Sequence, residues 1–418
     1  MNRRNFLYGA SAALAAMGVA LPSRAVGVND RKLIFVFAPG GWDPTRVFAP
    51  EFANPNVSME ARAERASKGG LAWVSHPDRP SVDLFFDNQH QRSLVVNGMM
   101  VRSIAHEICT MITMTGTSSG LAPDWPAIVA NQDRVAYTLP HLVISGPSFP
   151  GDLGVAVART GVNGQLEALV SGEVEQWSAV PVQSPDRVDE DLIDRYLARR
   201  AGARAEGSRS EVEARLTAAF RDSTSKVGEL KDLRYTMDFQ ASILLEDQAR
   251  VAVDALKNGV SRCVTIAYAG AQGQGWDTHA QNDDAQSPLW EGLFAGLLRL
   301  TALLEGTPGH SGATLADETM VVVLSEMART PALNGLLGKD HWPYTSAMLV
   351  GPNLTGDRVV GGFDDAYYGK LVDPATAEVS ETGEVLSAES LGATLLTWAG
   401  IDPAEHVSGV APLDGVLA

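Results

Sequence analysis

The sequence has few cysteines and a shortage of positive charge. Cys109 and Cys263 are the only thiols, and both sit among apolar residues. Export would permit a disulfide, but the sequence does not place the two together, and we interpret both as core residues. Lys and Arg number 33 against 50 Asp and Glu, a formal net charge of -17 at pH 7. Such a surface repels phosphate backbones and anionic lipid headgroups, so no nucleic-acid or membrane-surface partner is expected.

Beyond the N-terminus, the sequence also lacks any apolar run long enough to cross a membrane. The N-terminus itself reads MNRRNFLYG, then ASAALAAMGVALP, then SRA. Paired Arg3 and Arg4, a short apolar run and small residues at a cleavage site are typical of a twin-arginine export signal. The run is shorter than the roughly 20 residues that span a bilayer. We therefore predict a signal peptide over 1–25, cleaved after Ala25, and a periplasmic or secreted mature protein.

The remaining chain, 26–418, has the composition of a globular protein, with 45% hydrophobic and 20% charged residues. Short apolar runs closed by Gly or Pro predict strands. They lie at 32–37, 93–99, 142–146 and 262–270, and in ETMVVVLSE and SAMLVGPN. Helical patterns at 105–116 and about 288–305 alternate with these runs. We predict one α/β domain with a mostly parallel sheet and helices on both faces.

Between residues 186 and 258 the chain changes character. It is first charged and rich in Arg and Ala, and then carries apolar residues at three- and four-residue spacing up to Gly259. Both patterns favour helices. We predict a helical insertion over 186–258 that packs on the sheet, and interpret its charge runs as solvated helix faces.

Three predicted strands are followed at once by an acid or an imidazole. KLIFVF leads to Asp43, RCVTIAYAG leads to Asp277 and His279, and TMVVVL leads to Glu326, after which DHW brings His341. Ligands of such sheets bind beyond the carboxyl ends of the strands. The set therefore suits one divalent cation with oxygen and nitrogen ligands, with Zn, Mn, Ca and Mg all open. The same residues also suit helix caps, loop hydrogen bonds and surface ion pairs.

Four motifs resemble those of a known family: GGWDP, GWDTHAQN, VVVLSEMARTPALNG and GKDHWPYTSAMLVG. In this order behind a twin-arginine leader, they resemble an exported bacterial family catalogued as domain of unknown function fifteen-oh-one, over nearly all of the mature chain. That family is placed in the alkaline phosphatase and sulfatase superfamily. The resemblance implies a three-layer α/β/α sandwich and hydrolysis of phosphate or sulfate esters. It also implies metal-ligating roles for Asp43, Asp277, His279, Glu326 and His341.

The sequence departs from the superfamily pattern at two places. Met327 stands where a second imidazole is expected, and a thioether is a poor ligand for a hard cation. His106 occupies the nucleophile's position, and Cys109 lacks the following Pro and Arg that formylglycine formation requires. His106 is thus a metal ligand, a general base, a nucleophile or a core imidazole, with Thr110 as the fallback hydroxyl. Arg329 is either the group that binds a substrate oxyanion or part of a structural ion pair with Glu326 or Asp340.

These residues support two functions. The first is an exported, metal-dependent hydrolase of a small anionic ester or glycan, with His106 and Arg329 as catalytic residues. The alternative is a non-catalytic periplasmic binding or assembly protein on the same fold, which the missing nucleophile and imidazole favour. A calcium-stabilised structural protein is a third idea. No nucleotide cofactor is expected, because the glycines of GAQGQG do not open a helix and include no Lys.

Overall fold

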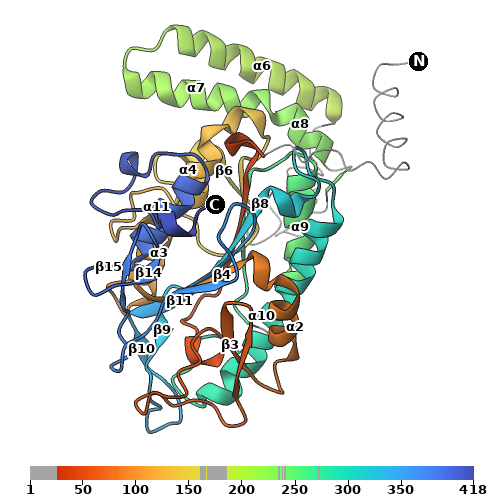
Figure 1. Cartoon of the computed structure of the whole chain (residues 1–418). Helices are drawn as coiled ribbons and strands as arrows, with labels where there is room; N and C mark the ends of the chain where they lie inside the picture. The colour runs from red at the N-terminus through yellow and green to blue at the C-terminus, as the bar shows by residue number, and fades with distance from the viewer. Residues whose placement is uncertain are drawn as a thin grey trace.

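An eight-stranded sheet forms the centre of the molecule (Figure 1). The structure is a computed structural model that describes residues 26–160, 166, 186–233, 236–237, 239, 242–270 and 274–418. The strand order is β12-β4-β11-β8-β1-β7-β5-β6. The strands are β1 (Lys32–Phe37), β4 (Ser93–Met100), β5 (His141–Val143), β6 (Val157–Arg159), β7 (Cys263–Ala267), β8 (Thr319–Leu324), β11 (Tyr344–Val350) and β12 (Arg358–Gly361). The predicted export signal over 1–25 lies outside the described residues, and export stays a prediction.

The central strands are apolar on both faces because helices cover both faces. In β1, Leu33, Phe35 and Phe37 belong to one hydrophobic core, and Ile34 and Val36 belong to the other. This alternation follows from the two-residue period of a strand. A strand buried on both faces reads as a continuous apolar run, which is why KLIFVF was recognisable in the sequence.

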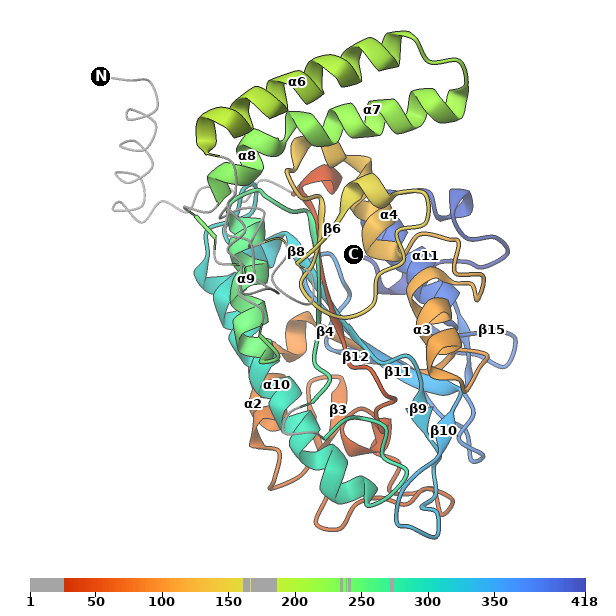
Figure 2. The same cartoon turned by 180° about the vertical axis from the view of Figure 1, so that it is seen from behind.

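Two helical layers enclose the sheet (Figures 1 and 2). One layer contains α2 (Pro80–Gln89), α9 (Leu245–Lys257) and α10 (Asn282–Gly306). The other contains α3 (His106–Thr115), α4 (Trp125–Gln132) and α11 (Ala388–Trp398). The predicted three-layer α/β/α fold with a mostly parallel sheet is therefore confirmed.

Strand β11 is the antiparallel member of the sheet. It runs opposite to both of its neighbours, β4 and β8. Its first residue, Tyr344, pairs with Met100, the last residue of β4. The beginning of β11 therefore lies at the edge where the parallel strands end. The segment before β11 shares this edge with the loops that follow β1, β4, β7 and β8.

In the described part of the predicted helical stretch over 186–258, the helices occupy two different places in the fold. Helices α6 (Arg187–Glu206) and α7 (Glu211–Ser225) form a hairpin across one end of the molecule, and α8 (Val227–Asp232) follows it (Figure 2). Asp186 and Ser210 cap the N-termini of α6 and α7 through their side chains. Helix α9, in contrast, belongs to the helical layer and packs on α10 and β7.

Smaller sheets complete the described part of the chain. They consist of β2 (Glu64–Lys68) with β3 (Leu71–Ser75), β9 (Ala328–Arg329) with β10 (His341–Trp342), and β13 (Leu371–Asp373) with β14 (Glu378–Val379) and β15 (Glu384–Val385). None of the helices in the described ranges combines the length and hydropathy needed to cross a bilayer.

Both cysteines are buried and free, which confirms their interpretation as core residues. Burial raises the pKa of Cys109 to about 11 and that of Cys263 to about 12. Both side chains are therefore protonated thiols at neutral pH. A thiol in that state is a poor nucleophile and a poor metal ligand.

Candidate metal centre

Three histidines and an aspartate meet at the edge where β4, β7 and β8 end and β11 begins. His106 is the first residue of α3, which follows β4. Asp277 and His279 follow β7, and His341 lies in β10, just before β11. The antiparallel direction of β11 is what brings His341 to this edge. Of the residues that the sequence predicted, these four lie together, Glu326 and Arg329 contact them, and Asp43 lies apart.

The ring Nε2 atoms of the three histidines converge on the Asp277 carboxylate. Asp277 Oδ1 lies 3.1 Å from His279 Nε2 and 3.2 Å from His341 Nε2. Asp277 Oδ2 lies 3.5 Å from His106 Nε2, and the Nε2 atoms of His279 and His341 are 3.0 Å apart. One ligand atom each from His106, Asp277 and His341 lie within 4.8 Å of one another. That is the spacing of ligands around a single ion.

Each imidazole is oriented through its other nitrogen. His106 Nδ1 lies 2.7 Å from Glu326 Oε1, and His279 Nδ1 lies 3.0 Å from Asp340 Oδ1. His341 Nδ1 lies 2.7 Å from the carbonyl oxygen of Ile104. Carboxylates and carbonyls only accept hydrogen bonds, so each Nδ1 carries the proton and donates it. In the neutral rings, every Nε2 then presents a lone pair to the others.

The convergence of these lone pairs requires positive charge. Three acceptor nitrogens and a carboxylate that face one another repel unless protons or a cation lie among them. The donor set of three imidazoles and one carboxylate fits a zinc-like ion. It fits Ca²⁺ poorly, because Ca²⁺ takes six to eight oxygen ligands. In histidine metal sites, the ring nitrogen that does not bind the metal usually donates a hydrogen bond to a carboxylate or a carbonyl.

Asp277 is kept ionised by a buried arginine. Arg329 Nη2 donates a hydrogen bond of 2.6 Å to Asp277 Oδ1. Burial opposes ionisation of Asp277, but the hydrogen bond and the positive charge of Arg329 prevail and lower its pKa to about 2. The guanidinium is fully buried and also donates to the carbonyls of Gly41 and Lys339. The sequence suggested a substrate oxyanion, Glu326 or Asp340 as the partner of Arg329, whereas the structure pairs Arg329 with Asp277.

Asp43 lies in a separate buried network. Its carboxylate is fully buried, 2.8 Å from Lys339 Nζ and 3.6 Å from Arg46 Nη2. It also accepts hydrogen bonds from Asn282 Nδ2 and Thr45 Oγ1, at 2.9 and 2.6 Å. Burial would raise the pKa of Asp43, but the two cations hold it well below its usual range. The structure thus places Asp43 on Lys339 rather than among the converging ligands.

Glu326 acts on the site through His106. Its Oε1 also accepts the Gly40 N–H at 2.8 Å, and its Oε2 accepts the Ser325 hydroxyl at 3.0 Å. The side chain is 2% exposed. Its neighbour Met327 packs in a small core cluster. The Glu326 side chain therefore contacts His106, whereas the Met327 side chain packs in the core.

The site is open to solvent. The exposed fractions of the His106, Asp277 and His279 side chains are 32%, 49% and 47%. His341 is 19% exposed. The fallback nucleophile Thr110 uses its hydroxyl to donate to the His106 carbonyl at 2.8 Å. Among the described residues, neither Thr110 nor the buried Cys109 thus presents a free nucleophile to the cluster.

Comparisons with known proteins give a family and a set of distant structural neighbours. A family model described as "Protein of unknown function (DUF1501)" matches residues 30–414. No curated protein matches the chain. Similar solved structures include the lipoteichoic acid synthase LtaP from Listeria monocytogenes, with 9% identity, TM-score 0.42 and coverage of 98% of this chain and 82% of that one.

Two further neighbours are similar to the chain at the same distance. PsFucS1 sulfatase from Pseudoalteromonas sp. has 10% identity and a TM-score of 0.39, with 100% of this chain and 76% of that chain covered. A protein in the alkaline phosphatase superfamily from Vibrio parahaemolyticus has 9% identity and a TM-score of 0.35, with 96% and 76% covered. Likenesses at this distance carry no conclusion about activity.

Proposed function

The chain belongs to a family known only as a protein of unknown function, DUF1501, and we propose from its site that it is a metal-dependent hydrolase of phosphate or sulfate esters. One observation carries the proposal. The Nε2 atoms of three histidines face a single carboxylate, while an acceptor holds each Nδ1. An ordinary polar loop needs no such arrangement.

The proposed roles follow from the contacts. His106, Asp277, His279 and His341 would hold the cation, which would supply Lewis-acid chemistry and a lowered pKa of nearby water. Glu326, Asp340 and the Ile104 carbonyl fix the three rings. Of the roles that the sequence left open for His106, this proposal takes the metal ligand rather than the nucleophile or the general base.

Arg329 positions the carboxylate of Asp277. Its guanidinium is buried and donates to protein acceptors, so we assign it to holding Asp277 ionised rather than to gripping a substrate. The attacking group is then a water molecule, because the Thr110 hydroxyl donates to the His106 carbonyl and the Cys109 thiol is buried. Exposure of Asp277 and His279 gives water and an ester access to the cluster.

Metal analysis followed by ester assays tests the proposal. The purified chain over 26–418 should contain about one equivalent of a divalent cation, Zn or Mn before Ca. Aryl phosphates and aryl sulfates are the first substrates, in line with the resemblance to the alkaline phosphatase and sulfatase superfamily. Chelation should abolish turnover, and the cation should restore it. Metal without turnover supports the non-catalytic alternative, and a chain that binds no divalent cation contradicts the site itself.

Glu326→Gln tests whether the charge of the carboxylate that accepts from His106 contributes to the affinity for the cation. The amide oxygen still accepts from His106 Nδ1, but the negative charge is lost. We expect metal affinity to fall by about 10–100-fold, the usual cost of a lost outer partner. Isothermal titration with Zn²⁺ measures it. The matched control is Glu107→Gln, an exposed glutamate beside His106 on α3 that should leave affinity unchanged. Equal affinities for both variants would contradict the role of Glu326.

A further inference from the structure

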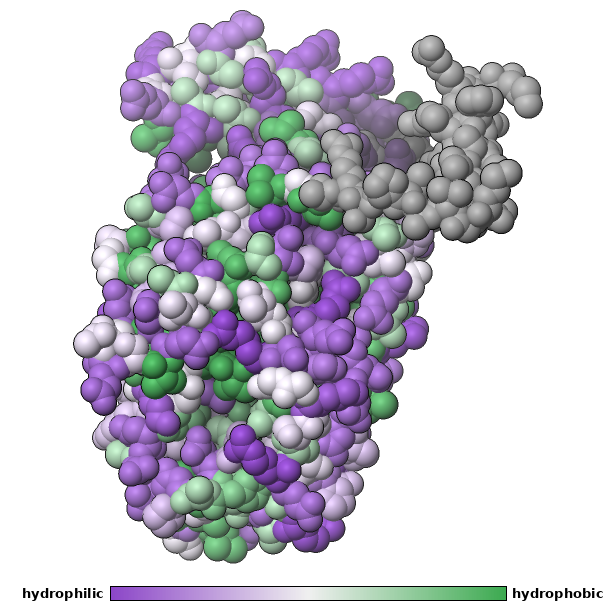
Figure 3. All heavy atoms as spheres, viewed as in Figure 1, coloured by the Kyte–Doolittle hydropathy of each residue, from purple (hydrophilic) through white to green (hydrophobic). Residues whose placement is uncertain are grey.

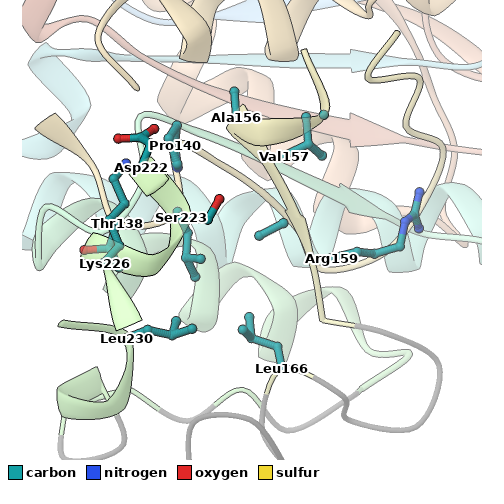
Figure 4. Close-up of a pocket in the computed structure, with 13 residues that line it drawn as sticks. Thr138, Pro140, Ala156, Val157, Arg159, Leu166, Asp222, Ser223, Lys226 and Leu230 are labelled. Carbon is teal, nitrogen blue, oxygen red and sulfur yellow. The ribbon is translucent and has the colours of Figure 1, made fainter. Parts of the chain in front are cut away.

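Neither of two features away from the proposed centre points to a ligand. On the α6–α7 hairpin, apolar side chains are visible among charged ones at the top of Figure 3, and nothing in the described part of the chain indicates what would cover them. A cavity of about 380 Å³ lies between β6 and the end of α7, with Asp222 and Lys226 on one side and Arg159 on the other (Figure 4). Lys226 Nζ and Arg159 Nη1 already donate to main-chain carbonyls. The buried residues beside the centre carry more.

Four buried residues next to the centre form a closed ring of hydrogen bonds. Gln286 Nε2 donates to Thr278 Oγ1 at 3.1 Å, and that hydroxyl donates to Asn282 Oδ1 at 2.7 Å. Asn282 Nδ2 donates to Asp43 Oδ2 at 2.9 Å, and the main-chain N–H of Asp43 donates back to Gln286 Oε1 at 2.9 Å. All four residues are buried. Because each residue donates to the next in the same direction, the loss of one polar side chain breaks the ring.

Gln286 also holds the main chain on the other side of Asp277. Its Nε2 lies 3.0 Å from the carbonyl oxygen of Trp276 and donates to it. The orientation of the amide follows from its partners, because the Asp43 N–H requires an acceptor and the Trp276 carbonyl requires a donor. Gln286 therefore binds the residue before Asp277 and, through Thr278, the residue after it.

Residues Trp276 to His279 alternate between buried anchors and exposed ligands. Trp276 is fully buried and Thr278 is 4% exposed, whereas the Asp277 and His279 side chains are 49% and 47% exposed. Successive side chains of an extended segment point to opposite sides, which permits this alternation. Two ligands that are open to solvent are thus held by the buried residues beside and between them.

The ring also reaches the segment that carries the third imidazole. The main-chain N–H of Lys339, two residues before His341, donates to the Thr278 carbonyl at 3.1 Å. Lys339 Nζ lies 2.8 Å from Asp43 Oδ2. A functional constellation has to be held to within about 0.5 Å, and the contacts behind it supply that precision.

We propose that Gln286 is a positioning residue of the metal centre, a role that rests on the proposed function. Its hydrogen bonds go to residues beside the ligands, and through them it fixes the Asp277 carboxylate relative to the His279 imidazole. A simpler explanation is that the ring only satisfies buried polar groups. That explanation predicts a loss of stability alone. Positioning also predicts a loss of affinity for the cation in the folded protein.

Gln286→Met keeps the length of the side chain and removes its polar atoms. Isothermal titration with Zn²⁺ should show an affinity lower by about 10-fold, at the low end of the cost of a lost outer partner. The matched control is Gln248→Met. Gln248 is a buried glutamine of α9 whose amide binds both the N–H and the carbonyl of Ala267. It should lower the free energy of unfolding without changing the affinity. Equal falls in affinity for the two variants would overturn the proposal.

Two substitutions at Thr278 decide the matter even if Gln286→Met does not fold. Thr278→Val removes the hydroxyl from the ring, and Thr278→Ser keeps it. We expect the fall of about 10-fold only in Thr278→Val. The visible absorption of bound Co²⁺ reports the geometry of the ligands, and it should change in Thr278→Val and not in Thr278→Ser. Wild-type affinity and absorption in Thr278→Val would show that the ring does not position the ligands.

Titration of the wild-type chain over 26–418 separates this role from the proposed function. A wild-type chain that binds no Zn²⁺ contradicts the centre itself and, with it, the role of Gln286. A wild-type chain that binds Zn²⁺ no more tightly than Gln286→Met and Thr278→Val leaves the centre intact and overturns the role of Gln286 alone.

Discussion

Asp277→Asn is expected to abolish binding of the divalent cation and ester hydrolysis while leaving the protein folded. Asp277 is the one carboxylate on which all three imidazoles converge. Its loss removes the ligand that offsets the cation's charge, so the fall in affinity should exceed the roughly 10–100-fold cost of a lost outer partner. Arg329 also loses an ionic acceptor, which should lower the free energy of unfolding by about 1–3 kcal/mol.

Thermal unfolding with and without Zn²⁺ separates these two effects. At 100 times its Kd, a cation raises the free energy of unfolding by about 2.7 kcal/mol. We expect this increase in the wild type and none in Asp277→Asn. His90→Asn is the control, because His90 Nδ1 also contacts an acid, Asp357, at 2.9 Å, but next to the beginning of β4. Wild-type stabilisation by Zn²⁺ in Asp277→Asn would rule out the proposed centre.

Lys339→Met is expected to cause the largest loss of stability. It leaves the Asp43 carboxylate, fully buried, without its nearest cation. Breaking a buried ion pair from one side costs about 3–5 kcal/mol, and Arg46, 3.6 Å from Asp43, then offsets the remaining charge only in part. Burial lowers the pKa of Lys339 to about 8 even though Asp43 opposes this, so the pair is charged at pH 7. Urea unfolding measures the loss.

Two further variants complete this experiment. Adding Asp43→Asn to Lys339→Met should recover most of the stability, because the Asp43 carboxylate that lost Lys339 is then replaced by a neutral amide. The control is Lys68→Met, whose exposed pair with Asp87 should contribute less than about 1 kcal/mol. Cation content of the double variant also decides the role of Asp43. Unchanged content shows a structural carboxylate, whereas loss comparable to that in Asp277→Asn shows the ligand that the sequence predicted.

The fold was predictable because each buried strand is a continuous apolar run that can be recognised from its own residues. KLIFVF and TMVVVL are continuous apolar runs, and they form β1 and β8 as expected. The direction of β11 was not predictable in this way. SAMLVGPN has the same apolar character as the parallel strands, and its antiparallel pairing is set by contacts with β4 and β8. Residue periodicity carries no information on strand direction.

The sequence singled out Asp277, His279, His341 and Arg329, but it did not indicate the partners of the cations or the separate position of Asp43. Asp277, His279 and His341 stood out because each lies beside an apolar strand. The partners of Lys339 and Arg329 depend on packing between distant segments, since Lys339 meets Asp43 and Arg329 meets Gly41. Lys339, two residues before His341 in GKDHW, was the one signal in this motif for a buried cation.

The antiparallel course of β11 also bears on the order in which the molecule is made. His106 and its partner Glu326 are 220 positions apart in the chain. His341 lies beside them because β11 lies between β4 and β8. Contacts of such long range carry a large loop-closure entropy and slow folding. At the proposed centre, uptake of a divalent cation would therefore report that β11 is in place in the sheet.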